Sequence, residues 1–111
     1  MKLKSVVNSK GQLVGYTHWC AGCRSRHMFN VSVPGEPPSR PCWTFDGNME
    51  KPTFSPSMRS YRPACEVDGV KYPEVTLCHY FLRAGEIEYL NDSTLHSLRG
   101  KHPLMDIPTD G

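Results

Sequence analysis

The chain is patterned in short runs of alternating apolar and polar residues, and this pattern predicts a fold built from β-strands. Residues 4–7 and 12–19 lie on either side of 8–11, a polar segment that contains glycine, so together they predict a β-hairpin. Residues 27–33 alternate again, with apolar side chains on one face, and predict a third strand. The first third of the chain is therefore expected to be β-structure.

The clearest hairpin signal lies in the last third of the chain. Residues 75–82 and 86–90 form two alternating runs, and the short glycine-containing turn at 83–85 joins them. Residues 61–73 contain two prolines and the turn signal Asp68-Gly69, so they predict a loop or a weak hairpin.

Prolines interrupt the alternation in the middle of the chain. Residues 34–41 carry four prolines and one glycine and are expected to form a surface loop. Residues 43–45 predict a short strand that the turn signal at 46–48 ends. The segment 51–57 reads Lys-Pro-Thr-Phe-Ser-Pro-Ser, and its two prolines favour an extended and rigid backbone. Its hydroxyl groups can satisfy backbone groups that no strand pairs with.

One helical element is expected near the end of the chain. Residues 91–94 offer several N-cap side chains ahead of 95–99, and Gly100 would end a single helical turn there. The tail to Gly111 is expected to be a final extended segment or a loose end. The predicted fold class is mainly β, with a small α+β fold as the variant.

The composition fits one compact, antiparallel β domain over residues 1–111. The chain has 10 prolines and 9 glycines among 111 residues, which favours turns and short strands over long helices. A domain of this size buries roughly two-thirds of its unfolded surface, so its core is modest. A metal ion that joins distant segments would add stability to such a core.

Charge and cysteine content narrow the class of protein. A net charge of +2 and a pI near 8.3 are too small an excess to indicate nucleic-acid binding, which needs a basic patch or stripe. No apolar run has the length of a membrane span or of a signal peptide, so a cytoplasmic protein is expected. Five cysteines is an odd number, which favours reduced thiols over a disulfide framework.

The segment Cys20-Ala21-Gly22-Cys23 is the strongest chemical signal in the chain. Two thiols at this spacing can face one cation, and zinc is the metal that such pairs hold most often in tetrahedral sites. The alternative, a redox dithiol, expects the pair at the start of a helix after a strand, and the pattern here shows neither. The other two ligands must come from elsewhere: the candidates are His18, His27, Cys42, Cys65, Cys78, His79, His96 and His102.

Strand alternation selects among these candidates. Neighbours on a strand point to opposite faces, so Cys78 and His79 should not both reach one metal, and Cys78 keeps the site rich in sulfur. His96 can close the tetrahedron from another segment. The predicted zinc ligands are therefore Cys20, Cys23, Cys78 and His96, with His27 and His79 as reserves, and with His79 or His18 as an alternative unliganded neighbour. Cys42 and Cys65 are expected to be free, or to pair with each other.

The order of these landmarks resembles a family of small phage and prophage proteins. The resemblance rests on His-Trp-Cys-x-x-Cys at 18–23, Pro-Thr-Phe-Ser-Pro-Ser at 52–57, Cys78-His79 and the later His96, and it spans most of the chain. It implies a phage origin and a metal-binding fold. Members are often labelled ammonia monooxygenase, but that chemistry calls for a membrane-bound, metal-dependent oxygenase, and this sequence has no membrane span.

Two classes of function follow from the sequence. The first is a module with a structural zinc ion that binds a host or phage protein. The second is a small hydrolase with a zinc-activated water, in which several side chains could move protons or orient a substrate: Glu74, Glu86, Asp92, His79, Ser55 and Ser57. A nucleic-acid-binding zinc module is a minor third alternative.

Overall fold

The computed structural model describes residues 1–37 and 40–108, and every regular element within them is a β-strand. The predicted mainly β class is thus confirmed, and the α+β variant is not. The strands are β1 (Lys4–Val7), β2 (Leu13–Cys20), β3 (Ser25–Asn30), β4 (Thr44–Phe45), β5 (Phe54–Arg62), β6 (Cys65–Val67), β7 (Val70–Tyr72), β8 (Val75–Arg83), β9 (Glu86–Tyr89) and β10 (Gly100–Pro103).

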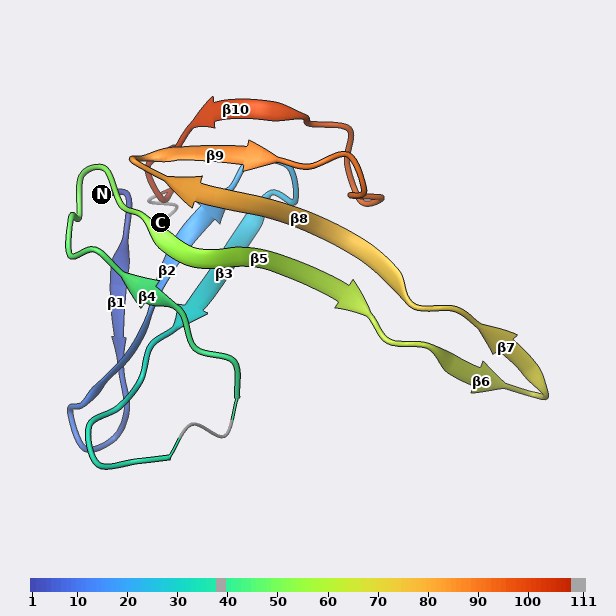
Figure 1. Ribbon diagram of the computed structural model, residues 1–111, viewed down its shortest axis with the longest axis horizontal. Coiled ribbons are helices and arrows are strands. Elements are labelled where there is room, and N and C mark those ends of the chain that lie inside the picture. Colours follow the sequence, from blue (N-terminus) through green and yellow to red (C-terminus); the bar gives the residue numbers. More distant parts are fainter. Residues whose placement is uncertain (38–39, 109–111) are drawn as a thin grey trace.

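The strands form three antiparallel sheets. The orders are β1-β2-β3, β10-β9-β8-β5-β4 and β6-β7. Figure 1 shows the strands of the three-stranded sheet crossing those of the larger sheet, while the β6-β7 hairpin extends away from both. The strands β2, β3, β5 and β8 lie where the two larger sheets meet, and they carry most of the residues discussed below.

The predicted hairpins are present, and their turns have the expected chemistry. In the first turn the side chain of Asn8 accepts hydrogen bonds from the amides of Lys10 and Gln12, at 2.9 and 3.0 Å. Between β8 and β9, Ala84 and Gly85 both have positive φ, as a two-residue type I′ turn requires. Asp68 and Gly69 do the same between β6 and β7, so the segment predicted as a loop or weak hairpin is a hairpin.

An aromatic stack forms the centre of the core between the two larger sheets. Phe29 of β3 and Phe54 of β5 are both fully buried and lie face to face, with ring centroids 4.2 Å apart. Trp43 closes the stack edge-on to Phe29 at 5.4 Å. Because these rings come from both sheets, their burial holds the sheets against each other.

The strand β5 departs from the prediction, since the proline-containing segment 51–57 leads into a central strand. Phe54 pairs with Leu82 of β8, and Met58 is the next residue to pair, with Tyr80. Three residues of β5, Ser55 to Ser57, therefore span the length of one residue of β8. Pro56 has no amide proton for the ladder, so the strand accommodates it by bulging.

The prediction of a helical turn at 95–99 is wrong, because the structure has no helix there. The amides of Thr94 and Leu95 donate instead to the carbonyls of Thr76 and Leu77 in β8, at 3.0–3.2 Å. The Ser93 hydroxyl, a predicted cap, accepts from the amide of His79 at 2.9 Å. Backbone groups that a helix would pair within itself are thus bonded to the neighbouring strand.

Two predicted segments are described only in part. Residues 38 and 39 of the proline-rich loop and residues 109–111 of the tail lie outside the described residues. The described tail contains β10, which adds a strand to the larger sheet. In the part of the chain that the structure describes, no helix is long and apolar enough to cross a membrane.

Candidate active site and metal-binding cluster

The four residues predicted as zinc ligands lie together. The ligand atoms of Cys20, Cys23, Cys78 and His96 are all within 4.8 Å of one another. The Sγ atom of Cys78 is 3.9 Å from that of Cys20 and 3.2 Å from Nε2 of His96. Four atoms bound tetrahedrally to zinc would lie about 3.5–3.8 Å apart, so the cluster has the dimensions of a metal site.

Three separate parts of the chain build this cluster. Cys20 ends β2, Cys23 lies in the turn before β3, Cys78 lies in β8, and His96 comes from the loop after β9. Gly22 is necessary for a steric reason, because a methyl group there would collide with the His96 imidazole. The positive φ of the turn falls on Arg24 and not on this glycine.

The thiols of the cluster share negative charge unequally. The hydrogen bond from Cys78 lowers the pKa of Cys20 to about 4, and the same contact raises the pKa of Cys78. Burial raises the pKa of Cys23 to about 11. One thiolate among three close sulfur atoms is therefore favoured, and a cation is needed before the others ionise.

His79 follows Cys78 directly but lies on the opposite face of β8, as alternation predicts. Its Nε2 atom is 3.1 Å from Oγ of Ser57, and its Nδ1 atom is 3.0 and 3.2 Å from the two carboxylate oxygens of Asp92. A carboxylate only accepts hydrogen bonds, so Nδ1 carries the ring proton and Nε2 accepts from the serine hydroxyl. Ser57, His79 and Asp92 thus form the hydrogen-bonded order of a serine nucleophile, its base and the group that orients the base.

The bulge in β5 positions Ser57 beside His79. Arg59 is the residue directly opposite His79, and Ser57 is its diagonal neighbour two positions earlier. The backbone carbonyl of Ser57 accepts a hydrogen bond from the indole nitrogen of Trp43 at 3.2 Å. The tryptophan therefore satisfies a carbonyl beside the bulge while its ring packs on the core.

The histidine and the aspartate are also held by their backbones. The amide of His79 donates to the hydroxyl of Ser93, which is buried. The carbonyl of His79 accepts a hydrogen bond from the amide of Leu90 at 2.9 Å. Ser93 is next to Asp92 in the chain, so one contact fixes the separation of base and carboxylate. The hydrogen bond from His79 lowers the pKa of Asp92, which keeps the carboxylate charged.

A second histidine network lies between the sheets. The hydroxyl of Tyr80 is 2.6 Å from Nε2 of His18 and 2.9 Å from Nδ1 of His27. Burial lowers the pKa of His18 to about 4 and that of His27 in the same direction. His27, a reserve ligand, is thus hydrogen-bonded to Tyr80 in this structure, and His18 is fully buried in the same network.

The other candidate residues lie elsewhere. Cys42 and Cys65 are free thiols, as expected. Glu74 forms an ion pair with Arg59, and Glu86 lies at the exposed start of β9. Sequence reasoning named Ser57, His79 and Asp92 only as helpers of a zinc-bound water and missed them as a triad. One signal for a separate site was present, since strand alternation already places His79 on the face of β8 opposite Cys78.

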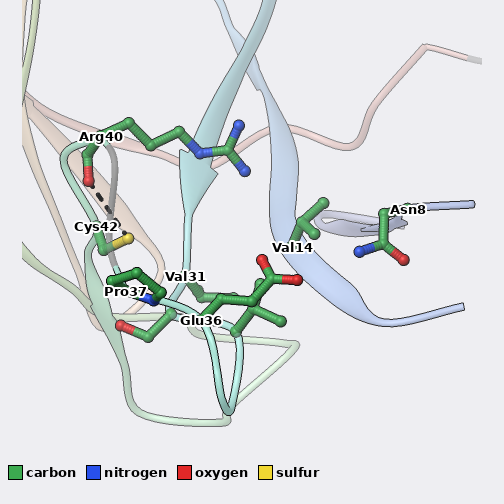
Figure 2. A pocket seen from close by; sticks show the side chains of 9 residues that line it. Asn8, Val14, Val31, Glu36, Pro37, Arg40 and Cys42 are labelled. Atoms are coloured by element: carbon green, nitrogen blue, oxygen red, sulfur yellow. Dashed lines mark hydrogen bonds between the residues drawn. The ribbon is translucent and has the colours of Figure 1, made fainter. Parts of the chain in front are cut away.

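A surface pocket of about 260 Å³ shares no lining residue with either site. Figure 2 shows it between the ends of β2 and β3 and the proline-rich loop, with Glu36 and Arg40 at its rim. The thiol of Cys42 lies there, 3.6 Å from the carbonyl of Arg40. The pocket therefore contains none of the residues that carry the chemistry proposed below.

The fold and the two sites together define a small β-protein with the side-chain arrangement of serine hydrolases on one face of a sheet and a Cys/His cluster on the other. The chain belongs to the BubE family, described as the serine protease of a bacterial ubiquitination-like system, whose model matches residues 2–90. Ser57, His79 and the three clustered cysteines lie within the match, whereas Asp92 and His96 follow it. No curated protein and no solved structure is significantly similar to the chain.

Proposed function

We propose that this protein is a serine peptidase in which Ser57 is the nucleophile, His79 the general base and Asp92 the residue that orients the base. The hydrogen-bonded chain from Ser57 through His79 to Asp92 is the observation that carries the proposal. The family description, a serine protease of a bacterial ubiquitination-like system, agrees with it and suggests a protein of such a system as the substrate.

The geometry prescribes the proton transfers. Ser57 Oγ attacks the carbonyl carbon of the substrate while its proton passes to Nε2 of His79, 3.1 Å away. The protonated His79 then gives this proton to the amine nitrogen as the C–N bond breaks, which leaves an ester on Ser57. Water hydrolyses the ester with His79 again acting as the base, and the hydroxyl of Ser57 is restored. Asp92 stabilises the positive charge that His79 carries between these steps.

The cluster is proposed to hold a structural Zn²⁺ ion. Its three sulfur atoms and one imidazole nitrogen are the preferred ligands of zinc, and four protein ligands complete a tetrahedron. A complete tetrahedron favours a structural ion over the alternative hydrolase, which needs an open position for water.

The triad residues also bear on the binding-module and nucleic-acid hypotheses. A pure binding module would not need a serine, a histidine and an aspartate in hydrogen-bonded order. If the protein binds a host or phage protein, we propose that it does so because that protein is its substrate. The nucleic-acid alternative gains no support from the site. Phage origin and cytoplasmic location stay predictions.

A fluorophosphonate probe tests the nucleophile without knowledge of the substrate. The probe loses fluoride and forms a phosphorus–oxygen bond only with an activated serine, while the base takes the hydroxyl proton. We expect one adduct on Ser57 of the zinc-loaded chain, found by mass spectrometry of its peptides. Ser57→Ala should abolish labelling. Ser55→Ala, two residues away and exposed, should label like the wild type.

Two outcomes would contradict the proposal. One is an unlabelled wild-type chain that is folded and contains zinc. The other is an adduct on a different serine that Ser57→Ala leaves in place. A metal-activated water forms no covalent adduct with the protein, so labelling of Ser57 also separates the serine mechanism from the zinc hydrolase.

A further inference from the structure

The triad and the cluster are built from the same two segments of the chain. In β8, Cys78 belongs to the cluster and His79 to the triad, on opposite faces of one strand. In the loop after β9, Asp92 belongs to the triad and His96 to the cluster. Whatever fixes Cys78 and His96 therefore also acts on the two residues that move and stabilise the proton.

The loop that carries Asp92 is held to β8 by hydrogen bonds and not by regular secondary structure. Residues 90–99 contain no regular secondary structure, and most of their side chains are exposed or half-buried. Ser93 is the exception, since it is buried and bonded to the amide of His79. The amides of Thr94 and Leu95, which lie between Asp92 and His96 in the chain, donate to the carbonyls of Thr76 and Leu77 in β8.

The cluster joins this loop to both larger sheets. His96 contacts Cys78 of β8, and Cys78 contacts Cys20 at the end of β2. The Tyr89 ring lies edge-on to His96 at 4.9 Å, and its hydroxyl is 3.3 Å from the Cys20 sulfur. The Nδ1 atom of His96 also accepts a hydrogen bond from the amide of Leu98 at 3.2 Å, which leaves Nε2 directed at the Cys78 sulfur.

From this arrangement we infer that Zn²⁺ bound by Cys20, Cys23, Cys78 and His96 positions the catalytic pair, so that peptidase activity depends on metal occupancy. The ion ties His96 to β8 and thereby fixes Asp92, four residues earlier, against Nδ1 of His79. It has no direct part in the reaction, since four protein ligands leave no position for substrate or water. His96 is in this sense a positioning residue, and the inference rests on the proposed function.

The experiment measures the labelling rate of Ser57 together with zinc content. Zinc is removed from the full chain with a chelator, and Zn²⁺ alone is then added back. We expect labelling to slow at least tenfold without zinc and to recover with it, because misplacement of a catalytic group by about 1 Å can cost about 100-fold in rate. His96→Ala should have the same effect on rate and zinc content. Cys42→Ser and Cys65→Ser serve as matched thiol controls and should change neither.

Two further variants separate positioning from a general effect on the fold. His96→Cys provides a fourth thiolate for zinc and should restore both metal content and labelling rate. The double variant Asp92→Ala/His96→Ala should label no more slowly than the slower single variant, because both changes act on the same hydrogen bond. Rates that simply multiply would mean that His96 acts independently of Asp92 and would overturn the inference.

The remaining outcomes are equally decisive. A metal-depleted chain that labels at the wild-type rate refutes metal dependence, and a purified chain that cannot bind zinc refutes the site. Loss of near-ultraviolet circular dichroism in His96→Ala would show that the metal holds the whole fold, and would overturn the specific positioning role. If zinc-loaded wild type is not labelled on Ser57, the proposed function itself fails, which is a distinct result.

Discussion

The exposed position of Asp92 determines how much its removal should slow the labelling of Ser57. Its side chain is 53% exposed, while that of His79 is 21% exposed, so water competes for the carboxylate. A hydrogen bond to a charged group contributes about 1.5–3 kcal/mol, and solvent reduces that value. Since each 1.36 kcal/mol is a factor of ten in rate, Asp92→Ala should slow Ser57 labelling about 10- to 100-fold.

This magnitude differs from that of a buried triad. Replacement of the buried aspartate of chymotrypsin-type enzymes lowers the rate about 10⁴-fold. His79→Ala removes the base itself and should cost about 10²- to 10⁴-fold here. The expected order of rates is therefore wild type, then Asp92→Ala, then His79→Ala, with Ser57→Ala unlabelled.

The assay is the pseudo-first-order rate of fluorophosphonate adduct formation, followed by intact-protein mass spectrometry at fixed zinc content and neutral pH. Glu86→Ala is the matched control, because this carboxylate is exposed and Glu86 pairs with Arg83 of β8 and not with His79. An Asp92→Ala rate equal to that of Glu86→Ala would refute the role of Asp92. A loss as large as that of His79→Ala would refute the argument from exposure.

Two further predictions concern stability, and a third concerns the β6-β7 hairpin. Phe29→Ala should lower the free energy of unfolding by about 3–5 kcal/mol and the melting temperature by more than about 10 °C, whereas Val70→Ala, at a position 52% exposed, should change it by less than about 0.5 kcal/mol; calorimetry that finds equal shifts would contradict the assigned core. Because burial lowers the pKa of His18 to about 4, the unfolded chain binds a proton between about pH 6.5 and 4 that the folded chain does not. The free energy of unfolding should therefore decrease by up to about 3 kcal/mol as the pH is lowered across this range. Urea unfolding of His18→Leu should lack this contribution, and an unchanged dependence on pH would disprove it. Replacement of residues 63–74 by Asn-Gly should leave zinc content and Ser57 labelling intact, because every side chain of β6 and β7 is exposed, and a lost zinc site would show that this hairpin supports the fold.

Local patterns predicted the outer hairpins well. The strands β1, β2, β8 and β9 and their turns follow from alternation and from glycine at turn positions, which act over a few residues. The central strand β5 could not be predicted in this way, because Pro56 counts against a central strand unless a bulge accommodates it. Whether a bulge forms depends on the partner strand β8, whose facing residues lie about 25 positions further along the chain.

The prediction of a helical turn at 95–99 was wrong for a related reason. Asn, Asp, Ser and Thr at 91–94 are good helix caps because their side chains bond to backbone groups, and the same property lets them bond to a neighbouring strand. Here Ser93 and Thr94 bond to β8. Propensity alone does not distinguish these two partners, since the choice depends on tertiary packing.

The two sites differ in how far sequence could go, and strand alternation explains the difference. The clustering of Cys20, Cys23, Cys78 and His96 was predictable residue by residue, because a zinc site needs four ligands of few types and alternation excluded His79 in favour of Cys78. The triad needs only one residue of each common type, so its members cannot be chosen until the bulge at Ser57 and the docking of Asp92 are known. Yet the exclusion of His79 from the metal face is also what directs it to the opposite face. A single Cys-His pair on β8 therefore gives one side chain to the Cys/His cluster and the other to the hydrogen-bonded chain of Ser57, His79 and Asp92, so the two sites do not compete for the same residue.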